Sequence, residues 1–183
     1  MDLRTRDEVE PAVMSVPSDA HADIITLYEY WLSISPNGKL PSRDDFDPID
    51  VPHLLPNLWL LEVHHDPLRF WRRTVGSRIE EFAGRNLTGG YVGEHLNNQK
   101  QSGVHSFLID VLESKRPSWR RGKPLISFEK EFSELERLYL PLAADGDTVD
   151  MILAMTVFKT LPLPSAINLN KVSSELDTST SIV

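Results

Sequence analysis

Two stretches of the sequence repeat apolar residues at the spacing of one helical face. The first places apolar side chains at positions i, i+3, i+4, i+7 and i+8: Ile24, Leu27, Tyr28, Trp31 and Leu32. This period predicts an amphipathic helix, which Ser18 or Asp19 is suited to cap and Pro36-Asn37-Gly38 to end. Two aromatic residues on one stripe need a large covering surface, either the domain's own sheet or a second copy of the protein.

The second stretch predicts a longer helix, from about Asn97 to Ser114. Its apolar residues have the same five-position spacing: Val104, Phe107, Leu108, Val111 and Leu112. Lys115 and Arg116 suit the negative C-terminal end of this helix, and Pro117 ends it.

Runs of apolar, β-branched and aromatic residues between turn signals predict five strands. They are expected at residues 57–63, 68–75, about 118–128, 135–142 and 148–158. Ser77-Arg78-Ile79-Glu80 has the pattern of a capping box, which predicts a short helix that ends at Gly84. Two strands, a helical insert and three strands give an α+β fold with an antiparallel sheet.

The last predicted strand is apolar at both alternating sets of positions. One set holds Val149, Met151, Leu153, Met155 and Val157, and the other includes Ile152, Ala154 and Phe158. Since side chains alternate between the faces of a strand, both faces are expected to be buried, which predicts a central position. The outer face then needs a cover, and the N-terminal helix is the candidate.

The composition narrows the class of protein. The 183 residues carry a net charge of −8 and no cysteine, which argues against nucleic-acid and anionic-membrane partners and excludes disulfides and thiolate metal sites. No stretch reaches the roughly 20 apolar residues of a membrane span, so a cytoplasmic protein is expected. Residues 1–18 and 161–183 lack a hydrophobic period and are expected to be a flexible arm and a disordered tail around one domain, 19–160.

Several local motifs follow one another in a fixed order. They are Leu40 to Pro48, Leu54 to Leu58, Phe70 to Ile79, Gly84-Arg85-Asn86-Leu87-Thr88-Gly89, and Leu138 to Leu142 followed by Asp145-Gly146. In this order they resemble a family of single-domain bacterial PAS proteins, over about residues 25–158. The resemblance implies a five-stranded antiparallel sheet with helices on one face, and a sensory or signalling role without catalysis. It supplies no catalytic residue and no ligand.

The resemblance also implies where a ligand would bind, because PAS pockets lie between the sheet and the long helix. With the helical stripe, this placement predicts the residues that border the pocket: Phe70, Arg72, Phe82, Val104, Phe107, Leu108 and Tyr139. Arg72 and Thr74 stand where related proteins tend to carry an aromatic and an aliphatic residue. This departure argues against a purely apolar ligand.

Three other patterns each have a functional and an ordinary interpretation. His95 and His105 offer a haem ligand, although His105 stands at the border of the stripe, as a surface histidine would. Glu62 with His64-His65-Asp66 offers metal ligands, but strand neighbours point to opposite faces, and a solvated hairpin turn explains the pattern better. Residues 115–123 hold five cations and one tryptophan, which suits a phosphate, nucleotide or acidic partner, or else a charged edge strand. Neither a cofactor nor a metal is expected.

The leading hypothesis is a non-enzymatic sensory module that binds a small molecule and passes its state to an unidentified signalling protein. The alternatives are an interaction adaptor whose core is filled by its own side chains, and a small α+β enzyme. A homodimer is expected, because one helical stripe cannot cover two surfaces within one chain, whereas two copies around a two-fold axis can. The residues predicted at that interface are Ile24, Leu27, Tyr28 and Trp31.

Overall fold

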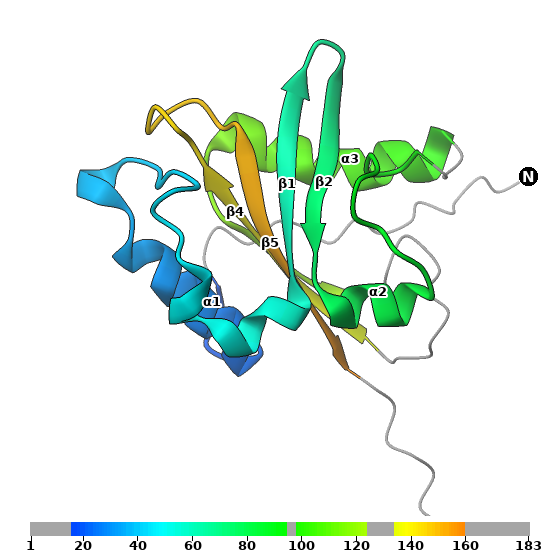
Figure 1. Cartoon of the computed structure of the whole chain (residues 1–183), viewed down its shortest axis with the longest axis horizontal. Coiled ribbons are helices and arrows are strands. Elements are labelled where there is room, and N and C mark those ends of the chain that lie inside the picture. Colours follow the sequence, from blue (N-terminus) through cyan, green and yellow to red (C-terminus); the bar gives the residue numbers. More distant parts are fainter. Residues whose placement is uncertain (1–15, 95–97, 124–133, 160–183) are drawn as a thin grey trace, which may run out of the picture.

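Five strands form one antiparallel sheet with the spatial order β2-β1-β5-β4-β3. The computed structural model describes residues 16–94, 98–123 and 134–159, with the side chains of the last helix described from residue 105 onward (Figure 1). The strands are β1 (Leu58–His65), β2 (Leu68–Val75), β3 (Ser118–Gly122), β4 (Glu134–Leu142) and β5 (Met151–Lys159). The helices are α1 (Ala22–Ser33), α2 (Ser77–Ala83) and α3 (Asn98–Ser114), with three 3-10 turns, η1 (Pro36–Gly38), η2 (Pro48–Asp50) and η3 (Pro52–Asn57). The five-stranded α+β architecture expected from the sequence is confirmed.

β5 occupies the centre of the sheet. It pairs with β1 on one side and with β4 on the other, and residues 152–158 are buried without interruption. The sequence predicts this position correctly, because a strand that is covered on both faces has no solvent side and therefore needs no polar alternation.

α1 covers one face of the sheet with the apolar stripe seen in the sequence. Ile24 and Leu27 are fully buried, and Trp31 is 6% exposed. These side chains share one apolar cluster with residues of β4 and β5: Leu138, Leu140, Leu142, Leu153 and Met155. The indole N–H of Trp31 donates to the Pro141 carbonyl at 3.1 Å, so a buried hydrogen bond fixes the position of α1 along β4.

α2 and α3 lie on the other side of the sheet from α1 (Figure 1). Under α3, one apolar cluster contains Phe70, Leu108, Val111, Tyr139 and Ile152. Under α2, a second cluster contains Phe82 and Phe158, whose stacked ring centroids lie 3.9 Å apart. This face is therefore covered by two separate apolar clusters, and some strand positions between them belong to neither.

Both predicted helix caps are wrong in detail. α1 is capped by His21, whose ring accepts from the Asp23 N–H, because the Asp19 carboxylate instead pairs with Arg121 of β3 at 2.7 Å. α2 begins after Gly76 without a side-chain cap. Glu80, the expected acceptor of the capping box, receives the Leu87 N–H at 3.0 Å. In both cases the carboxylate that the local motif would use as a cap binds a residue outside the first turn of the helix instead.

The hairpin between β1 and β2 is tighter than expected, because β1 extends through His65 and only Asp66 and Pro67 separate the strands. The predicted arm, tail and third strand fall partly in residues 1–15, 160–183 and 124–133, which lie outside the described residues. Within the described ranges, no helix combines the length and apolarity that a membrane crossing requires.

Candidate functional site

Polar side chains occupy the strip of sheet between the α2 and α3 clusters. Because side chains alternate along a strand, Arg137 and Thr156 face the same side as residues two positions away, which pack under the helices. Arg120 lies opposite Arg137 in the β3–β4 register, and Arg137 lies opposite Thr156 in the β4–β5 register. Ser118 lies opposite Tyr139. Together these five residues are named the inner polar patch: Ser118, Arg120, Arg137, Tyr139 and Thr156.

Four of the five residues of the inner polar patch are buried, and Arg137 is half-buried. Ser118, Arg120 and Thr156 are 3%, 2% and 1% exposed. The Thr156 hydroxyl has a partner, since it accepts from the Trp59 indole N–H at 3.1 Å. A buried polar atom without a partner costs about 1–3 kcal/mol, so a patch of this kind inside a core is retained only where hydrogen bonds or a function compensate for it.

Arg120 crosses under α3 and is held there from two sides. Its Nη2 donates to the Asp110 carboxylate at 3.1 Å, and its guanidinium lies 3.9 Å from the centre of the Phe107 ring. Burial lowers the pKa of Arg120, while Tyr139 and Asp110 act in the opposite direction. An arginine in such a place stays protonated, so the patch carries a buried positive charge.

Arg137 is the second cation of the patch and lacks a counter-ion in the described part of the chain. Its guanidinium lies 6.0 Å from the Phe107 ring, and its Nε is buried without an acceptor among the described residues. The buried Ser118 hydroxyl likewise has no partner there. Neither of these two donors therefore has an acceptor among the described residues.

The residues predicted to border a pocket are distributed over this face. Phe70, Leu108 and Tyr139 share the cluster under α3, and Phe107 contacts the two arginines of the patch. Phe82 belongs to the separate cluster under α2. The side chain of Val104 lies outside the described residues. Their role as ligand contacts stays a prediction.

Arg72 binds backbone at the other edge of the sheet. Its Nε donates to the Leu87 carbonyl at 2.7 Å, and its guanidinium lies so close to Gly90 that a Cβ there would come within 2.5 Å of Nη2. The backbone of β2 also pairs with this loop, because the Gly89 N–H donates to Arg72 O and the Val92 N–H to Phe70 O. Through these contacts Arg72 holds residues 87–92 beside β2.

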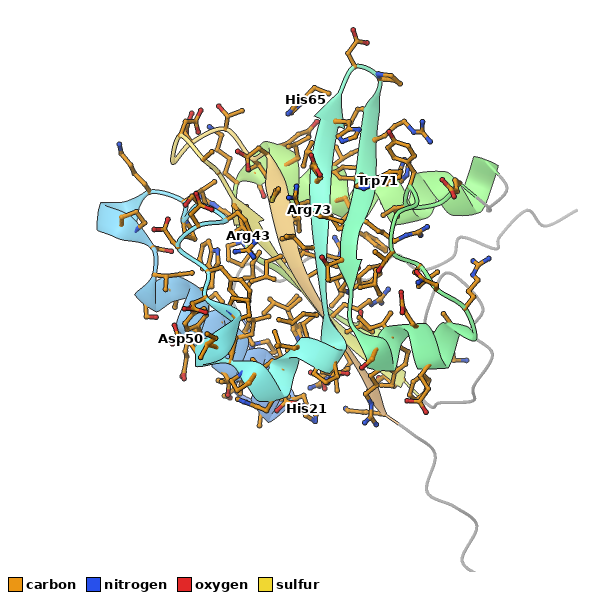
Figure 2. All side chains as sticks on the ribbon, in the orientation of Figure 1. His21, Arg43, Asp50, His65, Trp71 and Arg73 are labelled. Atoms are coloured by element: carbon orange, nitrogen blue, oxygen red, sulfur yellow. The ribbon has the colours of Figure 1, made fainter. Side chains whose placement is uncertain are left out.

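His64 and His105 are engaged in ordinary contacts within the chain. His105 Nε2 lies at hydrogen-bond distance, 2.9 Å, from the Val92 carbonyl, and His64 Nδ1 lies 3.1 Å from the Tyr91 hydroxyl. His65 is near the tip of the β1–β2 hairpin (Figure 2), and His95 lies outside the described residues. In the ranges that the structure describes, no three His, Asp or Glu side chains converge as metal ligands would.

The basic run at residues 115–123 is tied to acidic groups of the same chain. Lys115 pairs with Asp147 at 2.6 Å, and Arg121 pairs with Asp19 at 2.7 Å and with Glu136 at 3.3 Å. β3 is an edge strand of the sheet, as the ordinary interpretation of this run required. The expected solvation of that strand is wrong at residues 118–120, however, because these three residues are buried.

Sequence reasoning named Phe107 and Tyr139 but missed Ser118, Arg137 and Thr156. Thr156 carried a signal, since it is the polar exception among the even-numbered residues from 152 to 158 in an apolar strand. Arg137 carried none, because its pairing with Arg120 depends on the register between β3 and β4.

The residues predicted at a dimer interface are largely covered within one chain. Ile24, Leu27 and Trp31 pack on the sheet, and the half-buried ring of Tyr28 stacks on Trp31 with 6.4 Å between centroids. α1 therefore lies on the sheet of its own chain. The sequence analysis left this arrangement open as the alternative to a dimer. The homodimer itself stays a prediction.

Comparison with known proteins agrees with the architecture. A family model described as a PAS domain matches residues 19–157, well over half of the chain. No curated protein matches the sequence. The family model spans the three helices, the inner polar patch and the sheet up to the last two residues of β5. The chain therefore belongs to the PAS domain family.

Proposed function

We propose that this protein is a sensory module that binds a small polar molecule at the inner polar patch and reports its presence to a signalling partner. PAS domains as a class are sensory or signalling modules that generally lack enzymatic activity, and this supports the general role. The location between sheet and α3 is where the sequence resemblance implies a ligand. The proposal adds that polar groups of the sheet make the contacts.

The observation that carries the proposal is the pair of unsatisfied donors under α3. Arg137 Nε and the Ser118 hydroxyl are buried without partners in the described part of the chain. Apolar residues at these positions would avoid a cost of about 1–3 kcal/mol for each such group. Donors without an acceptor among the described residues are available to a bound molecule. Its hydrogen bonds to them would offset the free-energy cost of their burial.

The sheet offers a short route from the patch to α1. Glu136 precedes Arg137 in β4 and therefore faces the opposite side, where its Oε2 accepts the His21 N–H at the start of α1 at 2.8 Å. Arg121 follows Arg120 in β3 and pairs with the same Glu136. A ligand that shifts Arg120 and Arg137 would therefore also move the two side chains that hold the start of α1.

The second candidate function is an adaptor that binds another protein without a ligand. The observation in its favour is a set of exposed apolar side chains on α1, η2 and η3: Leu32, Ile49 and Leu55. Ile49 is 82% exposed, although the Tyr30 hydroxyl ties this turn to α1 through Asp50 at 3.0 Å. A partner protein would cover these side chains in either candidate function, so they do not separate the two.

Native mass spectrometry of freshly purified protein separates the candidates. A sensory module should carry a bound small molecule whose mass disappears on denaturation, and Ser118→Ala should reduce its occupancy. Ser33→Ala is the matched control, because Ser33 lies on α1 and its hydroxyl donates to the nearby Tyr30 carbonyl at 2.6 Å, away from the patch. Wild-type protein that carries no small molecule, even from concentrated lysate, would favour the adaptor.

A further inference from the structure

We infer that the molecule bound at the inner polar patch is a small organic acid with one carboxylate, held by Arg137 beside Arg120. This inference rests on the proposed function and names the chemical class of its ligand. It follows from the charges of the patch, from the shape of the free donors and from the side chains around them.

Among the residues that the structure describes, the charges of the patch do not balance. Arg120 and Arg137 contribute two positive charges, and Asp110, which pairs with Arg120 at 3.1 Å, is the carboxylate that compensates one of them. Like charges directly opposite on neighbouring strands destabilise a sheet, because their Cβ atoms lie only about 5 Å apart. A ligand with a single negative charge would leave the patch neutral.

Two other arginines of the sheet, Arg121 and Arg72, already have ion-pair or hydrogen-bond partners. Arg121 pairs with Asp19 and Glu136, and Arg72 donates to the Leu87 carbonyl. Arg137 differs from both because, among the described residues, its guanidinium has neither an ion-pair partner nor an acceptor for its buried Nε. The Nε and one Nη of a guanidinium form the fork that receives a planar carboxylate through two parallel hydrogen bonds.

The surroundings favour a carboxylate with an apolar body over an inorganic anion. The Phe107 ring lies beside both guanidiniums, and Tyr139 is buried in the cluster under α3. A phosphate monoester carries a charge of about −1.5 to −2 at neutral pH, which would leave excess negative charge in a buried place. A single carboxylate matches Arg137, which has no counter-ion among the described residues, and an attached apolar group matches the aromatic neighbours.

The test is a thermal unfolding titration of the full chain with defined probes. Sodium benzoate and sodium acetate supply the carboxylate, benzamide is the uncharged analogue of benzoate, and sodium phosphate is the alternative anion. Sodium chloride keeps the ionic strength equal in all samples. Wild type is compared with Arg137→Met, which keeps the apolar stem, and with Arg137→Lys, which keeps the charge but loses the fork. Arg73→Met is the matched control, since Arg73 is an exposed cation on β2 that pairs with Glu62 (Figure 2).

We expect benzoate to raise the Tm of wild type and Arg73→Met, and the concentration for half of this rise to increase at least tenfold in Arg137→Met. Arg137→Lys should retain part of the effect, and benzamide should have none. Without ligand, Arg137→Met should unfold at or above the wild-type Tm, because it loses a like-charge contact. A purely structural arginine would instead lower the Tm when replaced.

Four results would overturn the inference. They are equal stabilisation of wild type and Arg137→Met by benzoate, equal effects of benzoate and benzamide, stabilisation by phosphate alone, and no stabilisation by any probe. Mass spectrometry of the small molecules that wild type releases on denaturation distinguishes failure of the carboxylate inference from failure of the proposed function. A released neutral or cationic molecule would leave a sensory module with a different ligand, whereas no released molecule would end both proposals.

Discussion

Replacing Glu136 with glutamine should lower the free energy of unfolding by about 2 kcal/mol at neutral pH. The Glu136 side chain is 1% exposed and joins four elements of the fold. Its Oε2 accepts the His21 N–H at 2.8 Å, and its Oε1 lies 3.3 Å from Arg121 Nη2 and 3.2 Å from Lys159 Nζ. The carboxylate thereby connects the start of α1 to β3, β4 and β5.

The magnitude follows from the exposure of the partners. Glutamine keeps an acceptor for the His21 N–H but loses the attraction to both cations. Removing one partner of a fully buried ion pair costs about 3–5 kcal/mol, and an exposed pair contributes about 0–1 kcal/mol. The side chains of Arg121 and Lys159 are 22% and 40% exposed, so water can solvate them after the change. An intermediate cost of about 2 kcal/mol corresponds to a fall in Tm of roughly 6 °C for a domain of this size.

The effect should depend on pH in a defined direction. Burial alone would raise the pKa of Glu136, but the His21 N–H and the cations Lys159 and Arg121 outweigh it and hold the pKa below its usual value. A carboxyl group whose pKa is lowered by folding contributes its full stabilisation above its unfolded pKa, roughly 4.3. That contribution is lost as the pH falls through the folded-state pKa. The stabilities of wild type and Glu136→Gln should therefore converge in acid.

Chemical denaturation at pH 7 and at a series of acidic pH values measures both effects. Glu134→Gln on the same strand is the control, because Glu134 is 35% exposed and its ion-pair partner among the described residues is the half-exposed Lys159 at 3.1 Å. Its cost should stay below about 1 kcal/mol. Equal costs for the two variants, or a difference from wild type that grows in acid, would refute the assignment of Glu136 as a buried anchor of α1.

Three further predictions address the core and the turns. Phe107→Ala should cost about 3 kcal/mol in chemical denaturation, because the ring is buried against two guanidiniums; a cost well below this would indicate open space beside the ring. Trp31→Phe should cost about 1–2 kcal/mol, since it leaves the Pro141 carbonyl without its donor, and an unchanged midpoint would contradict this. The Asp145 carboxyl should titrate with a pKa of about 2 in NMR spectra, because the backbone N–H groups of Asp147 and Thr148 donate to it; its stabilising effect would then disappear only as the pH falls from about 3.9 towards 2.

The elements of the fold were predictable because their signals are local. The stripe on α1 and the two-sided apolar pattern of β5 each follow from residues within one element. The helix caps were not predictable, because Asp19 is taken by Arg121, 102 positions further along the chain. A local motif indicates what a group can do, whereas tertiary contacts determine its actual partner.

The candidate site shows the same division. The helical stripe places Phe107 over the sheet, so this part of the site was accessible to sequence reasoning. The pairing of Arg120 with Arg137 was not, because a shift of one residue in the β3–β4 register would move one of them to the opposite face. The positive charge under α3 is therefore a property of strand register that the sequence does not display.

The contact between β2 and residues 87–92 has a consequence for the solubility of the protein. An outermost strand with free N–H and C=O groups is a template on which other chains can aggregate. β2 is the outermost strand on its side of the sheet, but the backbone groups of Phe70 and Arg72 along its outer edge are bonded to Gly89, Gly90 and Val92. The backbone of residues 89–92 thus protects this edge from the addition of a foreign strand. The hydrogen bond from Arg72 to the Leu87 carbonyl holds this protecting segment in place.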